Sequence, residues 1–266
     1  MTPPARIATY ATRRLRYAPL AWGLPLGLLC LMIVAIFPSI KGTPQLEQLL
    51  DSYPEAFKQA FGVTAASLQT IEGYLAVEVF SLIAPLATAY FVIHALARAV
   101  CGSEQRGVLD IVLSAPVRRY HLLAGWLGAV AAVLAAILLV IGVICQLAAL
   151  AFGVDLAVAS TVAAIANLWP LSVFFGGLTL LLAGLSSRTL AVTGIATATL
   201  VAMYFLEVLG KLSSAAATVD GLSAFHYYGS AIENGIDPVA FIGLTGAGLL
   251  LAAAGAALFE RRDVRA

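Results

Sequence analysis

Long apolar runs, separated by shorter polar stretches, form the dominant pattern along the chain. Each run is about twenty residues or longer, which is the length that an α-helix needs to cross a bilayer. We therefore expect an all-α polytopic membrane protein with a single transmembrane domain over residues 1–266. The six predicted spans are residues 20–40, 74–100, 122–152, 158–185, 190–209 and 239–259.

Proline and glycine within the spans predict local features of packing. Span four contains Pro170 and the pair Gly176 and Gly177, a pattern that favours a broken or bent helix. In span three, Gly125 and Gly128 are spaced for close contact with another helix. The three cysteines lie far apart in or beside apolar runs, so we interpret them as buried small hydrophobes rather than as a disulfide or metal site.

The segments outside the spans predict smaller elements. Residues 1–19 interleave arginines with apolar residues, which favours an amphipathic helix on the cytoplasmic membrane surface, with a solvated basic tail as the alternative. Residues 41–73 form a polar external loop, with a short amphipathic helix expected over residues 44–60. Residues 210–238 form a second external loop, whose aromatic cluster favours a position at the outer membrane interface.

The positions of the charges give the expected orientation. Hydrophobic residues make up 61% of the chain, charged residues 11%, and the mean hydropathy is +0.97, which excludes an ordinary soluble domain. Of the 15 Lys and Arg residues, only Lys41, Lys58 and Lys211 fall outside when both termini and the loop after span two are placed in the cytoplasm. The positive-inside rule favours this orientation.

The polar segment between spans two and three, residues 102–120, predicts a short amphipathic helix. Ser103 is a candidate N-cap, followed by Glu104 in the first turn, and Pro116 ends the pattern. Apolar residues recur between them at helical spacing, at Val108, Leu109, Val112 and Leu113. Mixed charges and Gly107 favour a protein partner over the lipid surface, and an ordinary solvated loop is the alternative.

The run from Glu104 to Arg119, EQRGVLDIVLSAPVRR, resembles the cytoplasmic coupling segment of ABC transporter type-2 permeases. The segments YPEAF at 53–57 and GYL at 73–75 are similar to a drug-exporting subset of that family. The resemblance implies a fold with an N-terminal amphipathic helix, a coupling helix between spans two and three, and an interfacial or re-entrant segment between spans five and six. It also implies a bacterial inner membrane location, with both termini cytoplasmic.

The resemblance implies a transmembrane subunit of an exporter driven by ATP. The phosphate-binding pattern G-x-x-x-x-G-K-[ST] is absent, so we expect no cofactor in this chain, and ATP and Mg²⁺ in a separate nucleotide-binding subunit. A second permease copy, alike or different, is also implied. The residues expected to couple to the ATPase subunit are Glu104, Gln105, Arg106, Gly107, Val108, Leu109, Asp110, Val112 and Leu113.

The expected cargo is a hydrophobic or amphipathic small molecule, with lipid or peptide as alternatives. Polar residues inside the spans are costly and are therefore candidates for a substrate path: Glu78, His94, Gln146, Asn167 and Glu207. The alternative for both glutamates is simple access to water, for His94 an interhelical hydrogen bond, and for the two amides structural contacts. An intramembrane enzyme and a membrane anchor for a soluble complex are the competing functions.

Overall fold

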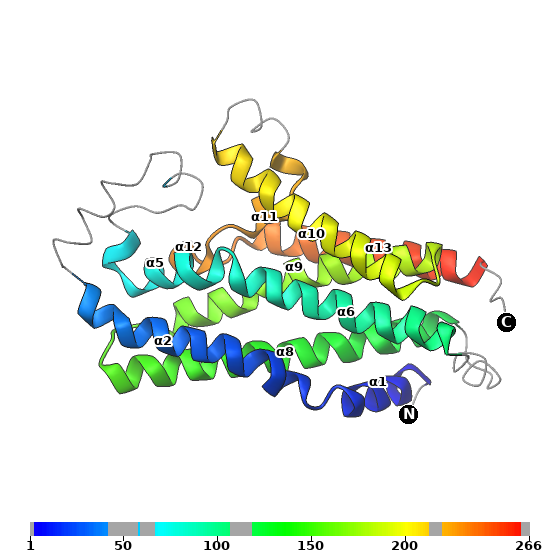
Figure 1. The fold of residues 1–266 in the computed structure, drawn as a ribbon, viewed down its shortest axis with the longest axis horizontal. Helices are drawn as coiled ribbons and strands as arrows, with labels where there is room; N and C mark the ends of the chain where they lie inside the picture. Colours follow the sequence, from blue (N-terminus) through cyan, green and yellow to red (C-terminus); the bar gives the residue numbers. More distant parts are fainter. Residues whose placement is uncertain (1–2, 42–57, 59–66, 107–118, 213–219, 262–266) are drawn as a thin grey trace.

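The computed structural model describes residues 3–41, 58, 67–106, 119–212 and 220–261, and all regular structure within them is helical. Six helices are long and apolar enough to cross a membrane, which confirms the predicted fold class and number of spans for the described part of the chain. They run lengthwise through one elongated bundle (Figure 1). Their bounds are α2 (Leu24–Ile40), continuing from the π-helix η1 (Pro19–Gly23), α6 (Ile83–Gln105), α8 (Arg119–Phe152), α9 (Val158–Leu185), α10 (Thr189–Leu212) and α13 (Pro238–Arg261).

Shorter helices occupy the ends of the bundle and its connections. They are α1 (Pro3–Arg14), η2 (Ser67–Gln69), α5 (Ile71–Leu75), the π-helix η3 (Ala76–Phe80), η5 (Asp220–Leu222), α11 (Ala224–Tyr228) and α12 (Ala231–Asn234). The helix predicted over residues 44–60 and most of the predicted coupling helix lie outside the described residues.

The predicted second span, residues 74–100, is not one continuous helix. Elements α5 and η3 come first, and a two-residue turn then separates them from α6. Pro85 accounts for this break, because its ring lacks an amide hydrogen and clashes with the carbonyl four residues earlier, at Ser81. The interruption leaves a short helical piece beside the main span, at the end of the bundle away from both termini (Figure 1).

Helix α9 is the centre of the bundle and packs against α6, α8, α10 and α13. The helix is not broken, because it continues from Val158 to Leu185 with Pro170 inside it. The glycine pair instead provides close contacts on two sides: Gly176 faces Val92 of α6, and Gly177 faces the backbone of Gly248 on α13. In contrast, Gly128 of α8 is exposed, and a Cβ added there would meet no other described segment within 4 Å, so the predicted close contact is not made at that position in the described part of the chain.

Residues 220–237, which precede α13, form a folded-back segment that packs onto the protein. Elements α11 and α12 pack on α9, and α11 also contacts α10. Phe225 and Tyr228 are buried there, whereas His226 and Tyr227 are exposed. The prediction of an interfacial aromatic loop is therefore only half right, because two of the four aromatic side chains fill the protein interior.

Helix α1 lies along α8, and both termini are at the same end of the bundle (Figure 1). With 34 residues, α8 is about 50 Å long and exceeds a hydrocarbon core of roughly 30 Å. Ala11 of α1 is fully buried while Tyr10 is exposed. The predicted amphipathic helix is thus confirmed as a helix, and its buried face packs against protein.

Candidate functional site

The first residues of the predicted coupling segment lie in the last turn of α6. Ser103 does not cap a new helix, because α6 continues through it and its hydroxyl donates a hydrogen bond to the Ala99 carbonyl over 2.6 Å. Glu104 and Gln105 follow in the same turn, and Arg106 is the residue that ends it. The remaining predicted coupling residues, from Gly107 to Leu113, lie outside the described residues.

The end of α6 is joined to the turn between α9 and α10. Thr189, the first residue of α10, donates a hydrogen bond from its hydroxyl to Gln105 Oε1 over 2.8 Å. Cys101 Sγ donates to the Ser186 carbonyl over 3.4 Å. These two contacts join the end of α6 to the start of α10 and to the residues just before it.

The five polar residues predicted inside the spans do not form one path. Gln146 donates a hydrogen bond to Thr161 over 2.6 Å and joins α8 to α9, as expected for a structural contact. His94 Nε2 accepts from Arg98 over 3.4 Å within α6, so the predicted interhelical bond is wrong. Glu78 is exposed and does not line the cavity described below.

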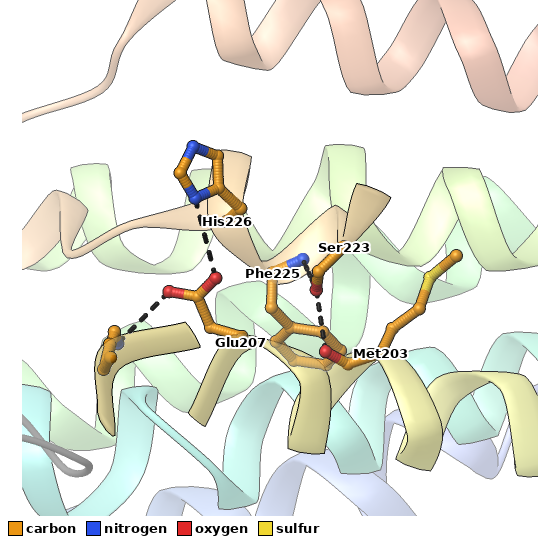
Figure 2. Close-up of polar contacts among 6 residues, drawn as sticks. Met203, Glu207, Ser223, Phe225 and His226 are labelled. Carbon is orange, nitrogen blue, oxygen red and sulfur yellow. Dashed lines mark hydrogen bonds and ion pairs between the residues drawn. The ribbon is translucent and has the colours of Figure 1, made fainter. Parts of the chain in front are cut away.

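Asn167 and Glu207 both lie beside the folded-back segment. The buried Asn167 side chain donates a hydrogen bond to the Tyr228 carbonyl over 2.5 Å and thereby holds α11 against α9. On the other side, the Ser223 hydroxyl donates to the Met203 carbonyl of α10 over 2.7 Å and accepts from the Phe225 amide (Figure 2). Helix α11 is therefore fixed between α9 and α10.

A cavity of about 250 Å³ lies where the break in span two, α9, α10 and the folded-back segment meet. Its wall combines aromatic rings with charged side chains. The residues that define the site are Phe80, Tyr204, Glu207, Lys211, Phe225, Tyr228 and Glu233. We call this the Glu207 cavity.

The carboxylate of Glu207 lies between two basic side chains. Its Oε1 is 3.3 Å from Lys211 Nζ, and its Oε2 is 3.7 Å from His226 Nδ1 (Figure 2). The Glu207 side chain is only 14% exposed, and its Oε2 is buried without a hydrogen-bond partner among the described residues. Burial also raises the pKa of the nearby Tyr228 phenol, which therefore remains protonated at neutral pH.

Sequence reasoning identified Glu207 but missed the residues that surround it in the cavity. Tyr204 lies one helical turn before Glu207 and Lys211 one turn after it, so spacing on a helix was the available signal. Glu233 and Thr189 offered no such signal, because their positions depend on how distant segments fold together. No group of three or more metal-ligating side chains occurs within the described ranges.

Comparison with known proteins adds a family to this geometry. Residues 7–260 match the family model described as "Multidrug efflux system permease Rv1217c, C-terminal domain". The match covers nearly the whole chain and confirms the resemblance to type-2 permeases, including its likeness to drug exporters. No curated protein gave a significant match.

Proposed function

Because the chain belongs to this multidrug efflux permease family, we propose that it is the transmembrane subunit of an exporter driven by ATP. In this proposal it moves a hydrophobic or amphipathic small molecule outward by alternating access. ATP and Mg²⁺ are bound and consumed in a separate nucleotide-binding subunit. The family match over residues 7–260 is the observation that carries the proposal.

The contacts at the end of α6 support a route for coupling. Residues 102–120 would receive the motion of the ATPase subunit, with Glu104 and Arg106 at the start of the contact. The Thr189 to Gln105 hydrogen bond would carry that motion to α10. Helix α10 spans about 36 Å and bears Glu207 near its other end, so it connects the two regions without an intermediate.

A second permease domain, identical or related, would complete the transport pathway. The matched family description refers to a C-terminal domain, which supports a transporter larger than one such unit. Helix α10 also exposes large apolar side chains that would face lipid or the second domain: Leu190, Ile195, Val201, Phe205 and Leu209.

We place the protein in an inner membrane with both termini in the cytoplasm. The α6 end lies at the same end of the bundle as the termini (Figure 1), which would put the coupling contact on the side of the ATPase. The Glu207 cavity lies toward the opposite end, where a cargo would be released.

Charge reversal at Glu104 tests the proposal. The variant Glu104→Lys should lower ATP-dependent export in inverted vesicles about tenfold or more, because like charges in a protein contact cost several kcal/mol. Glu260→Lys is the matched control, since Glu260 is exposed at the same end of the bundle on α13. Protein level and membrane insertion should be equal in both variants.

Full export by the Glu104→Lys protein would remove the coupling claim. Purification from the native membrane without any ATPase subunit, under conditions that preserve complexes, would instead favour an intramembrane enzyme or an anchor. The two experiments therefore test the coupling residue and the class of protein separately.

A further inference from the structure

We propose that the Glu207 cavity binds an organic cation, an ammonium group attached to a compact aromatic or alkyl body. The proposal gives the chemical class of the cargo, and the role of this site in transport therefore rests on the function proposed above. The binding chemistry itself rests only on the contacts around Glu207.

The first argument is the incomplete pairing of the Glu207 carboxylate. A buried charge requires both an opposite charge and hydrogen-bond donors for its oxygens. Oε1 has Lys211 at 3.3 Å, whereas Oε2 has no hydrogen-bond donor among the described residues and lies 3.7 Å from His226 Nδ1. The N–H of an ammonium ligand would supply the missing donor.

Lys211 contacts the same carboxylate that the ligand would bind. Its side chain is 48% exposed, so its ammonium can leave Glu207 and remain hydrated. A ligand cation would then replace an internal ammonium with an external one, and the charge of the site would be balanced in both states. We therefore expect Lys211 to compete with the ligand.

The aromatic wall suits the body of such a ligand. Tyr204 and Phe225 meet edge to face with ring centroids 5.5 Å apart, and Tyr228 lies 6.5 Å from Phe225. All three rings line the cavity together with Phe80. A cation held over aromatic faces gains roughly 0.5–2 kcal/mol, and the same rings bury apolar groups.

The charges of the lining residues and the volume of the cavity narrow the class of ligand further. Glu233 adds a second carboxylate to the wall and accepts a hydrogen bond from Ser230 over 2.8 Å, while Lys211 is the single Lys or Arg among the lining residues. This excess of acidic groups disfavours an anion. The volume of about 250 Å³ is just below the usual range for ligand pockets, roughly 300–1,000 Å³, and thus favours a compact molecule.

Equilibrium dialysis of the full-length protein in nanodiscs tests the proposal, with empty nanodiscs subtracted. The probes are the N,N-dimethylbenzylammonium cation, its uncharged carbon analogue isobutylbenzene, and the phenylacetate anion. We expect saturable binding of the cation alone. Glu207→Gln should weaken that binding about tenfold or more, whereas the distant control Glu260→Gln should leave it unchanged.

Lys211→Met provides an effect of opposite sign that loss of folding cannot produce. Removing the competing ammonium should tighten binding of the cation several-fold. Equal binding of isobutylbenzene, preferential binding of phenylacetate, or weaker cation binding by Lys211→Met would each overturn the proposal. If Glu207→Gln does not fold, the Lys211→Met result and the comparison of probes still decide it.

These measurements require neither ATP nor a partner subunit, so they separate the site from the transport function. Cation binding without ATP-dependent export in any reconstitution would leave the site standing and remove the proposed function. Export of neutral compounds without cation binding would remove the proposed site and leave the proposed function standing.

Discussion

Several hydroxyl groups inside the spans donate a hydrogen bond within their own helix. Thr88, Thr179 and Thr245 each donate a hydrogen bond to a carbonyl four residues earlier, which spares the bundle an unpaired polar group. Thr189 differs, because its hydroxyl reaches Gln105 on another helix. A hydrogen bond between two helices depends on their relative position, whereas a bond within one helix does not.

The Thr189 contact therefore gives a test of coupling at a single atom. Thr189→Val keeps the shape and removes the hydroxyl, so the α6 end loses its bond to α10. One hydrogen bond contributes about 0.5–1.5 kcal/mol, and export per ATP hydrolysed should fall roughly two- to tenfold. The measurement is paired export and ATPase activity of the reconstituted transporter.

Thr199→Val is the matched control for this experiment. Thr199 lies on the same helix and is half-buried, and its hydroxyl donates within α10 to the Ile195 carbonyl. Its replacement should leave the ratio of export to ATP hydrolysis unchanged. Equal ratios for both variants would show that the bond to Gln105 plays no part in coupling.

For single residues, the sequence predicts which polar side chains are costly to bury in a membrane, but it does not predict which of them contact each other. Asn167 and Gln146 were singled out by their polarity inside apolar runs alone, and each makes a hydrogen bond to another segment. The partner of Asn167 is a backbone carbonyl 61 residues away, and no local pattern contains that information. Glu207 was identified in the same way, while Glu233 could not be.

Among the helices, α9 and α13 approach most closely, through glycines spaced seven residues apart on each. Gly177 faces Gly248, and Gly184 faces Gly255, in each case backbone against backbone. A Cβ at Gly184 would lie 2.6 Å from the Gly255 carbonyl oxygen. Without a hydrophobic driving force in lipid, such close packing is a main source of attraction between helices.

Replacing one of these glycines tests the contact. In Gly177→Ala the new methyl group would overlap the Gly248 carbonyl, and the helices must separate. We expect a loss of about 1–3 kcal/mol in stability, typical of overpacking. Thermal unfolding in detergent, followed by size-exclusion fluorescence, measures the effect as a lower midpoint.

Gly246→Ala on α13 is the control, because no other described segment comes within 4 Å of the added methyl group. Alanine is the better helix former by about 1 kcal/mol, so this variant should be as stable as the native protein or slightly more stable. A decrease of equal size in both variants would contradict the proposed packing.

Element boundaries followed from the sequence where one signal acted alone, as in α13, predicted as 239–259 and observed as Pro238–Arg261. They failed where backbone and packing effects compete. Pro85 breaks the second span, whereas Pro170 leaves α9 continuous. Both are prolines in apolar runs, and the sequence does not reveal which run has neighbours that hold it together.

The two ends of the bundle carry different functional features and different basic residues. Both termini and the α6 end lie at one end of the bundle, whereas the Glu207 cavity and the end of α2 lie toward the other (Figure 1). The arginine-rich segments follow the first end, and Lys41 ends α2 at the second. This arrangement agrees with the orientation expected from the positive-inside rule.

Labelling in intact cells tests that orientation. A membrane-impermeant maleimide should modify Lys41→Cys but not Arg261→Cys, and permeabilised cells should allow both reactions. The native cysteines are all buried, so the unmodified protein is a low-background control. The reverse pattern would invert the protein in the membrane and remove the proposed site of coupling.

The two adjacent glycines of α9 pack this helix closely against two neighbours at once. Gly176 brings α9 close to α6 and Gly177 brings it close to α13, so a side chain added at either position would push the helices apart. We expect these three helices to move together. Helix α10 meets α6 at the Thr189 to Gln105 hydrogen bond and carries one wall of the Glu207 cavity, so a change in its tilt would change the shape of that cavity.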